Sequence, residues 1–202
     1  MKEVIDAFHD HYYHTTHIEW LGIPVRKCPL DLWIYQEIMF AVKPDVIIEC
    51  GTYMGGSAYF LSSICDLMNK GKVITIDIQA MEQRPAHPRI IYLLGSSTSE
   101  AVYSQVKSMI AAHEVVMVIL DSDHSKHHVL HEMNLYGQLV TPGSYMIVED
   151  TNINGHPVLP GWGPGPMEAV AEFVQQRPDF RIDHSREKLI LTYNPSGYLQ
   201  KI

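Results

Sequence analysis

Short apolar runs alternate along this chain with longer segments whose apolar residues are spaced three and four apart. The first complete pair is "DVIIEC" (45–50), a continuous apolar run rich in β-branched residues, followed by "SAYFLSSICDLMN" (57–69). A run of the first kind is typical of a strand buried on both faces, whereas the second spacing predicts a helix. Repeated alternation of strand and helix predicts an α/β fold, with helices on both faces of a mostly parallel sheet.

The same pattern continues to the end of the chain. The closing segment "FRIDHSREKLILTYNPSGYL" (180–199) predicts two strands around the turn "DHSREK", so that a seven-stranded sheet ends in an antiparallel hairpin. Pro44 is expected to end the helix that precedes the first strand. The other expected strands span residues 72–78, 89–97, 114–124 and 145–157, and the other expected helices span 30–42, 99–112, 127–140 and 167–176.

The chain divides into an arm and a domain. Residues 1–28 predict an N-terminal arm, made of a short amphipathic helix and an irregular segment, and residues 29–202 predict one Rossmann-like domain. A chain of 202 residues is long enough for one sizeable core. Four aromatic residues beside glycines and prolines suit a lid or an acceptor pocket, and they equally suit core or dimer contacts: Tyr12, Tyr13, Trp20 and Trp162.

A glycine-rich turn follows the first strand in "IIECGTYMGGSA" (47–58). Ligands of open α/β sheets bind outside the carboxyl ends of the strands, where a tight glycine turn lets the backbone approach them. Asp77 ends the next strand, 26 positions after Gly51 (77 − 51 = 26), and such an acid can accept the hydroxyls of a ribose. The two features together predict an adenosine-containing ligand.

The details of the turn separate two such ligands. A dinucleotide fingerprint, G-x-G-x-x-G, needs a glycine at position 53, where Tyr53 stands instead. Glu49 places an acid near the charged tail of the ligand, which suits an ammonium group better than a phosphate. The turn therefore favours S-adenosylmethionine, and an NAD(P)-dependent oxidoreductase is the alternative enzyme class.

Acidic residues follow the fourth and fifth strands in "VILDSDHS" and "MIVEDTNING". Asp121, Asp123, Glu149 and Asp150 are expected to converge at one edge of the sheet, and no run of Lys or Arg nearby in the sequence would neutralise them. Oxygen ligands of this kind suit magnesium, calcium or manganese. A divalent cation is therefore predicted here. A non-catalytic adenosine- or metal-binding module is a third interpretation of the same residues.

The composition and net charge of the chain limit the classes of partner that it is expected to bind. The formal net charge of −8 disfavours nucleic-acid binding, which needs a basic face, and no apolar run approaches the roughly 20 residues of a membrane span. Three cysteines in no metal or redox spacing argue against a disulfide framework, so a reducing, cytoplasmic setting is expected. We expect a small-molecule acceptor, no nucleic-acid or membrane partner, and a chain that is compatible with a homo-oligomer.

The chain resembles the class I methyltransferases and, more narrowly, the cephalosporin hydroxylase family, whose members are similar to metal-dependent O-methyltransferases. The resemblance runs from about residue 30 to the end, through "IIECGTYMGGSA", "VITIDI", "LLGSST", "VILDSDHS", "MIVEDTNING" and "LTYNPSGYL". It implies metal ligands at Asp121, Glu149 and Asp150. It also implies S-adenosylmethionine contacts at Glu49, Gly51, Thr52, Gly55, Ser57, Asp77, Ser96 and Asp121.

The resemblance implies methyl transfer to a hydroxyl of a sugar or natural product, with Mg²⁺ as the expected cation. The cation would hold the acceptor oxygen and lower its pKa, while Asp123 or His124 takes the proton. In related enzymes with a D-x-D pattern, the first acid holds the metal and the second is the base. A closer relative has two adjacent acids in that loop, which leaves the assignment of Asp121 and Asp123 open.

Overall fold

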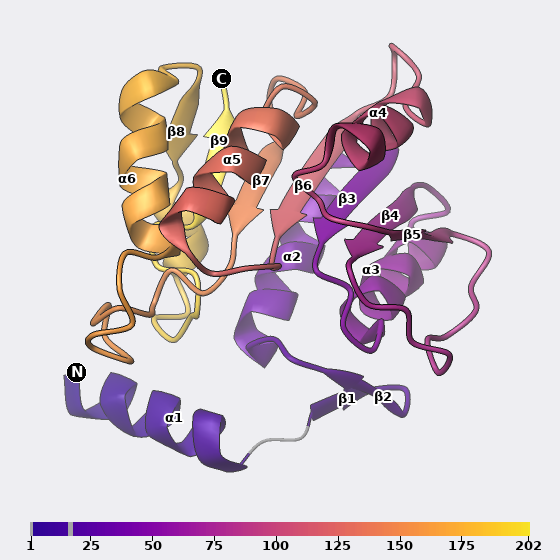
Figure 1. Cartoon of the computed structure of the whole chain (residues 1–202). Helices are drawn as coiled ribbons and strands as arrows, with labels where there is room; N and C mark the ends of the chain where they lie inside the picture. The colour runs from indigo at the N-terminus through magenta and orange to yellow at the C-terminus, as the bar shows by residue number, and fades with distance from the viewer. Residues whose placement is uncertain (1, 16–17) are drawn as a thin grey trace.

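A computed structural model describes residues 2–15 and 18–202 of the chain (Figure 1). Its main sheet has seven strands in the order β5-β4-β3-β6-β7-β9-β8. The helices are α1 (Lys2–Thr15), α2 (Pro29–Val42), α3 (Gly56–Leu67), α4 (Glu100–Ser108), α5 (Lys126–Tyr136) and α6 (Pro166–Gln176), with a 3₁₀ helix, η1 (His184–Glu187). The strands are β1 (Ile18–Trp20), β2 (Ile23–Val25), β3 (Val46–Cys50), β4 (Lys72–Asp77), β5 (Ile90–Leu94), β6 (Val116–Leu120), β7 (Tyr145–Val148), β8 (Phe180–Ile182) and β9 (Tyr198–Lys201).

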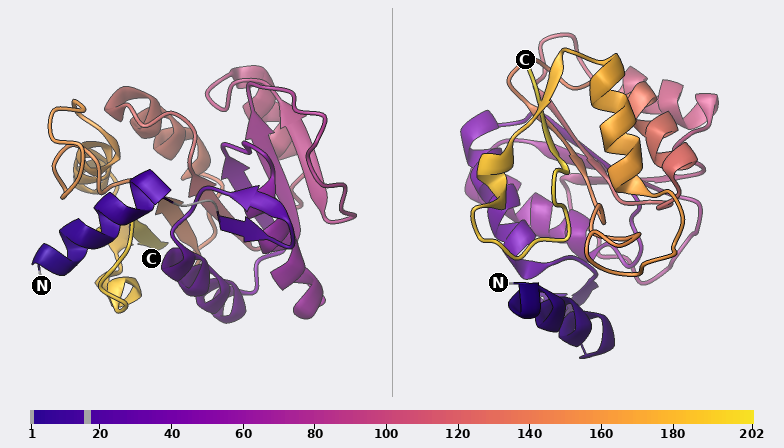
Figure 2. Two further views of the ribbon diagram at one scale, coloured as in Figure 1. Left: turned by 90° about the horizontal axis from the view of Figure 1, so that it is seen from below. Right: turned by 90° about the vertical axis from the view of Figure 1, so that its left-hand side faces the viewer.

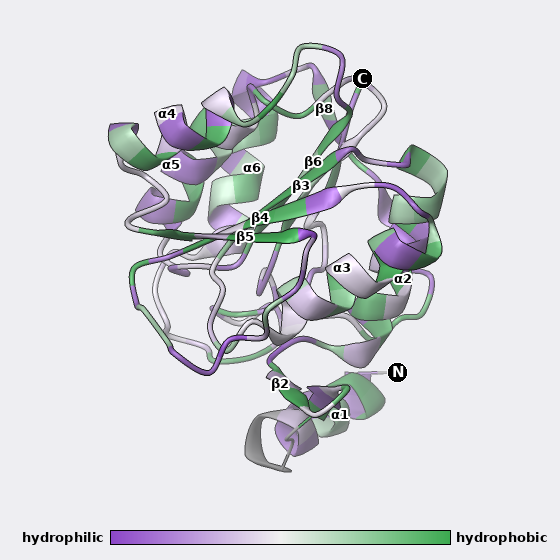
Figure 3. Ribbon diagram, turned by 90° about the vertical axis from the view of Figure 1, so that its right-hand side faces the viewer, coloured by the Kyte–Doolittle hydropathy of each residue, from purple (hydrophilic) through white to green (hydrophobic). Residues whose placement is uncertain are grey.

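Helices pack on both faces of this sheet, as the sequence predicts (Figure 2). Helices α4, α5 and α6 share one apolar core with one face, whereas α2 and α3 share a second core with the other. Within β3, Ile48 belongs to the first core and Ile47 to the second, because successive side chains of a strand point to opposite faces. Most residues of the central strands are therefore hydrophobic (Figure 3).

The sheet is parallel from β5 through β7, and β9 runs antiparallel to both of its neighbours. This confirms the predicted fold class, a Rossmann-like α/β sheet with an antiparallel strand near the C-terminus. The expected strands 114–124 and 145–157 are shorter than predicted and end at Leu120 and Val148. The acids follow these strand ends directly, at one edge of the sheet.

The closing hairpin differs from the expected one. Its first strand, β8, lies where predicted, but its second is β9, beginning at Tyr198, and the run after the turn "DHSREK" is not a strand. Asp31 of α2 explains the difference: its carboxylate accepts from Thr192 Oγ1 (2.5 Å) and from the backbone N–H of Tyr193 (2.8 Å). These contacts replace the ladder hydrogen bonds that a strand at this position would make.

The arm contains a β-hairpin where an irregular segment is expected. β1 and β2 pair antiparallel around Leu21 and Gly22, whose φ angles of 50° and 82° are those of a tight two-residue hairpin loop. Trp20 packs edge-on against Phe60 of α3 and donates from Nε1 to Ser63 Oγ (3.1 Å). Packing against α3 therefore stabilises two strands too short to form alone.

Helix α2 begins with Pro29 in its first turn and ends at Val42, followed by Lys43 in a left-handed conformation. The backbone N–H of Lys43 donates to Met39 O (2.7 Å), and Pro44 then prevents continuation, as expected. No helix within residues 2–15 and 18–202 combines the length and the apolar character that crossing a membrane requires.

Candidate active site

A cavity of about 490 Å³ opens at the carboxyl ends of the central strands. The glycine turn after β3, the end of β4 and the loops after β5 and β6 form its walls, and the N-terminal arm closes one side. Most of the residues predicted to contact S-adenosylmethionine line it. These are Gly51, Thr52, Ser57, Asp77, Ser96 and Asp121.

Gly51 directly follows β3 and lies against the backbone of Asp121, which directly follows β6. Its φ is +98°, and a Cβ on this residue would lie 1.8 Å from the backbone oxygen of Asp121. Only glycine fits there, so this glycine serves strand packing as well as ligand access. Gly55, with φ +83°, is the N-cap of α3 and shapes the turn without lining the cavity.

Glu49 is fully buried behind the cavity wall. Its Oε2 accepts from Thr75 Oγ1 (2.7 Å), whereas Oε1 has no partner in hydrogen-bonding geometry within the described part of the chain. Burial raises the pKa of Glu49 to about 7, against the opposing effects of Lys27 and the hydroxyls of Ser57 and Thr75. A buried acid with an unused oxygen is suited to a cationic partner from a ligand.

Asp77 is engaged by the backbone of the glycine turn. Its Oδ2 accepts from the N–H groups of Thr52 (3.1 Å) and Tyr53 (2.8 Å), and Oδ1 accepts from Gln79 N (2.9 Å). The Arg84 guanidinium also lies 3.0 Å from Oδ2. Asp77 therefore holds the turn in shape, and Oδ1 keeps one acceptor position for a ligand hydroxyl.

The acids after β6 and β7 converge because these strands are neighbours. The ladder extends one residue past the strands, with Glu149 N donating to Leu120 O (2.9 Å). Asp121, His124 and Asp150 each offer a ligand atom, and these three atoms all lie within 4.8 Å of one another. His124 Nε2 lies 3.2 Å from Asp150 Oδ2. The described residues thus bring two carboxylates and an imidazole together at the edge of the cavity.

The backbone of Asp150 is unusual and fixed. Its φ is +54°, a left-handed conformation that few residues adopt, although Asp and Asn do so more readily than most. Asn194 Oδ1 accepts from the Asp150 N–H (3.1 Å), and Asn194 Nδ2 donates to Tyr35 Oη (2.9 Å). The loop before β9 therefore orients Asp150 toward His124.

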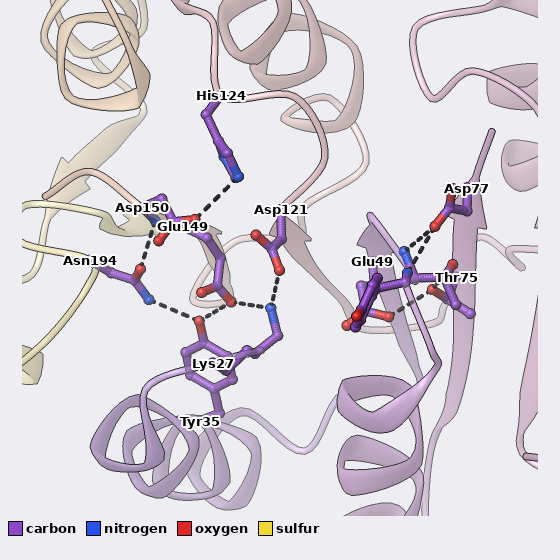
Figure 4. A network of polar contacts seen from close by, with 12 residues as sticks. Lys27, Tyr35, Glu49, Thr75, Asp77, Asp121, His124, Glu149, Asp150 and Asn194 are labelled. Carbon is purple, nitrogen blue, oxygen red and sulfur yellow. Dashed lines mark hydrogen bonds and ion pairs between the residues drawn. The ribbon is translucent and has the colours of Figure 1, made fainter. Parts of the chain in front are cut away.

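Glu149 faces the opposite way from Asp150, into the protein (Figure 4). Its Oε1 accepts from Tyr35 Oη and from Lys27 Nζ (2.6 Å). The same ammonium lies 2.7 Å from Asp121 Oδ2. Burial alone would lower the pKa of Lys27, but Asp121 and Glu149 outweigh it and raise that pKa above its ordinary value. The sequence has no run of Lys or Arg near these acids, and the lysine that pairs with them in the structure comes from the N-terminal arm.

Asp123 lies outside this cluster. Its Oδ1 accepts from the backbone N–H of Ser125 (2.7 Å), and hydrogen bonding to Ser125 holds the pKa of Asp123 below its usual range. Of the two acids left open by the sequence, Asp121 is the one that the structure brings beside Asp150 and His124. Both acids line the cavity, but Asp123 does not belong to the cluster.

The aromatic residues proposed for a lid have different positions. Tyr12 packs against Tyr193 and donates to the backbone oxygen of Lys27 (2.5 Å), and Trp20 is part of the hairpin contact with α3. Trp162 is 53% exposed in the loop after β7. The side chain of Tyr13 lies outside the described part of the chain.

Comparison with known proteins shows which family the chain matches. The family described as "Rhamnosyl O-methyltransferase/CmcI" matches residues 12–202. The rhamnosyl O-methyltransferase of Mycobacterium tuberculosis (strain ATCC 25618 / H37Rv) is 40% identical over 206 residues, which cover 97% of this chain and 84% of that protein.

Two solved structures share the fold. The structure described as "CmcI-N160 apo-structure" has a TM-score of 0.71 at 20% identity, covering 96% of this chain and 83% of that one. The structure described as "cmcI-D160 Mg-SAM" has a TM-score of 0.69 at 17% identity, covering 96% and 84%. At these identities the likeness establishes the architecture.

Proposed function

Because the chain belongs to the Rhamnosyl O-methyltransferase/CmcI family, it is an S-adenosylmethionine-dependent O-methyltransferase, and we propose that its acceptor is a hydroxyl of a small glycoside. One observation carries this proposal: Asp121 belongs both to the wall of the adenosine-sized cavity and to the cluster with His124 and Asp150. A methyl donor in the cavity and an acceptor oxygen at the cluster would therefore meet beside one residue.

The residues that line the cavity, together with Glu49 behind its wall, fit S-adenosylmethionine. We assign Glu49 Oε1 to the ammonium group of the donor, because it is a buried acid oxygen without a partner in the described residues. Asp77 Oδ1 can accept from a ribose hydroxyl, and Ser57 and Ser96 line the wall between these positions. Gly51 brings backbone close to the ligand without a side chain in the way.

The cluster fits a divalent cation, for which Mg²⁺ is our assignment. Asp121 and Asp150 supply the hard oxygen ligands that this ion prefers, and His124 lies beside them. Glu149 as a third carboxylate ligand stays a prediction, since its Oε1 contacts Lys27 and Tyr35 here.

When bound, S-adenosylmethionine supplies the methyl group, and the divalent cation polarises the acceptor hydroxyl. His124 is the group we assign to take the hydroxyl proton, because its ring lies in the cluster. Asp123 is a poorer base, since its carboxylate is engaged by Ser125 and its pKa is lowered. The cavity walls orient donor and acceptor, which supplies much of the rate in a transfer of this kind.

We also propose a cytoplasmic location. All three cysteines, Cys28, Cys50 and Cys65, are free and buried, which is compatible with a reducing compartment. Thiol titration of protein purified under non-reducing conditions checks this, and recovery of disulfide-linked chains would contradict it.

Calorimetric titration of S-adenosylmethionine and of NADH, each with and without Mg²⁺, tests the function first. We expect heat from S-adenosylmethionine and from Mg²⁺, none from NADH, and methylation of a rhamnosyl glycoside in a product assay by mass spectrometry. Binding of NADH without S-adenosylmethionine would overturn the methyltransferase assignment. Donor binding with methylation of a non-sugar phenol alone would overturn the acceptor class.

Replacing Glu49 with glutamine tests the ammonium contact. Hydrogen bonds to charged groups contribute about 1.5–3 kcal/mol, so affinity for S-adenosylmethionine should fall by roughly 10- to 100-fold. In the wild-type protein, affinity should also weaken as the pH falls below about 7, because Glu49 then takes up a proton that must leave before it can pair with an ammonium.

The E49Q variant should lose this pH dependence, and calorimetry between pH 6 and 8 measures both effects. E114Q is the control: Glu114 contacts Lys72 at the opposite end of the sheet, and its loss should leave donor affinity unchanged. Equal donor affinity for E49Q and the wild type would remove Glu49 from the binding site.

A further inference from the structure

Three acids and one lysine form a single charged group at the edge of the cavity. Asp121, Glu149 and Asp150 carry a formal charge of −3, and Lys27 contacts two of them, so that the four groups together carry −2. Among residues 2–15 and 18–202, Lys27 is the only lysine or arginine in an ion pair with these acids. A formal charge of −2 is the charge that one divalent cation neutralises.

Lys27 is held in a manner unlike that of a surface lysine. Its side chain is 1% exposed, and Nζ lies 2.7 Å from Asp121 Oδ2 and 2.6 Å from Glu149 Oε1. Tyr12 donates to its backbone oxygen from α1, and two residues later Pro29 begins α2. The backbone is thus fixed on both sides, and the ammonium has little freedom to leave.

The two oxygens of the Asp121 carboxylate face different groups. Lys27 contacts Oδ2 of Asp121, and Figure 4 shows the other oxygen of Asp121 on the side of His124 and Asp150. Glu149 is likewise oriented by Lys27 and Tyr35. Removing one partner of a buried ion pair leaves an uncompensated charge, which is strongly destabilising. Lys27 therefore compensates the negative charge of these acids when no metal ion is bound.

We propose that Lys27 is the charge-compensating residue of the cation site: its ammonium partly neutralises Asp121 and Glu149 before the metal arrives and sets the charge of the site to the value that one divalent cation balances. The N-terminal arm is then part of this site, because it supplies Lys27. The proposal rests on the proposed function, since it assumes that the cluster binds a divalent cation.

Replacement of Lys27 by methionine, which keeps the length of the stem and removes the charge, tests this role. We expect K27M to have a lower Tm than the wild type in EDTA, and to gain more in Tm from Mg²⁺ than the wild type does. Its affinity for Mg²⁺, measured by calorimetry without S-adenosylmethionine, should be about tenfold tighter, because a nearby positive charge no longer repels the ion. K27R should bind Mg²⁺ about as the wild type does.

K72M is the control for loss of a lysine elsewhere. Lys72 donates to Met109 O (2.9 Å) and contacts Glu114 at the opposite end of the sheet, so its loss should not change the affinity for Mg²⁺. Unchanged or weaker Mg²⁺ binding by K27M would overturn the role of Lys27. So would a K27M protein that stays unfolded, by circular dichroism, at saturating Mg²⁺, because the charge of the cation would then not replace the ammonium.

The two proposals fail in different ways. If the cluster does not bind a divalent cation, the wild-type protein gives no heat with Mg²⁺. If only the role of Lys27 is wrong, the wild type binds Mg²⁺ and K27M binds it no more tightly.

Discussion

Replacement of Asp150 by asparagine is expected to abolish Mg²⁺ binding and to reduce kcat/KM for methyl transfer by about a thousandfold. The carboxylate of Asp150 is one of two in the cluster, and loss of the stabilisation that a metal supplies to developing charge costs several kcal/mol. Asparagine is chosen because Asp150 has a left-handed φ of +54°, which asparagine tolerates better than alanine does. Calorimetry with Mg²⁺ and steady-state assays with S-adenosylmethionine measure the two effects.

Asp45 provides a matched control for this variant. Its side chain is 28% exposed, close to the 23% of Asp150, and it contacts Lys70 and the Val115 N–H at the other end of the sheet. D45N should lose some stability and keep both activity and Mg²⁺ binding. D150N should also keep its affinity for S-adenosylmethionine, because Asp150 does not line the cavity. A D150N protein with an unchanged Mg²⁺ heat would remove the cation from this cluster.

Replacement of His124 by glutamine is expected to lower kcat by about 10²- to 10⁴-fold, the usual contribution of a positioned general base. The steady-state kcat of both proteins, at saturating donor and Mg²⁺, measures this effect.

The comparison variant is D123N, since Asp123 is the competing base. Hydrogen bonding to Ser125 already holds the pKa of Asp123 below its usual range, so we expect its loss to change kcat by less than about tenfold. The opposite pattern, with D123N strongly impaired and the glutamine variant of His124 nearly active, would transfer the role of base to Asp123. Unchanged Mg²⁺ affinity in both variants would confirm that the difference lies in proton transfer.

Local sequence patterns were sufficient to predict the strands of the sheet. A strand that is buried on both faces appears in the sequence as a short continuous apolar run, which few other elements produce. The runs at 45–50 and 72–78 became β3 and β4, and the acids after β6 and β7 lie together since parallel neighbours end at one edge. Local pattern was insufficient where a short segment depends on a distant partner. The hairpin β1–β2 needs α3, and the run near Thr192 binds Asp31 instead of forming a strand.

The fold class, the glycine turn at Gly51 and the positions of the acids along the chain could be predicted from local patterns, because strand periodicity and turn chemistry act between neighbours. The contact of Lys27 with Asp121, 94 residues away, and the separation of Asp121 from Asp123 arise from folding alone. An ion pair depends on distance in space, and "PVRKCP" contains no signal of what its lysine will contact. Glu149 and Asp150 are adjacent in sequence, yet the left-handed backbone at Asp150 directs one carboxylate to Lys27 and the other to His124.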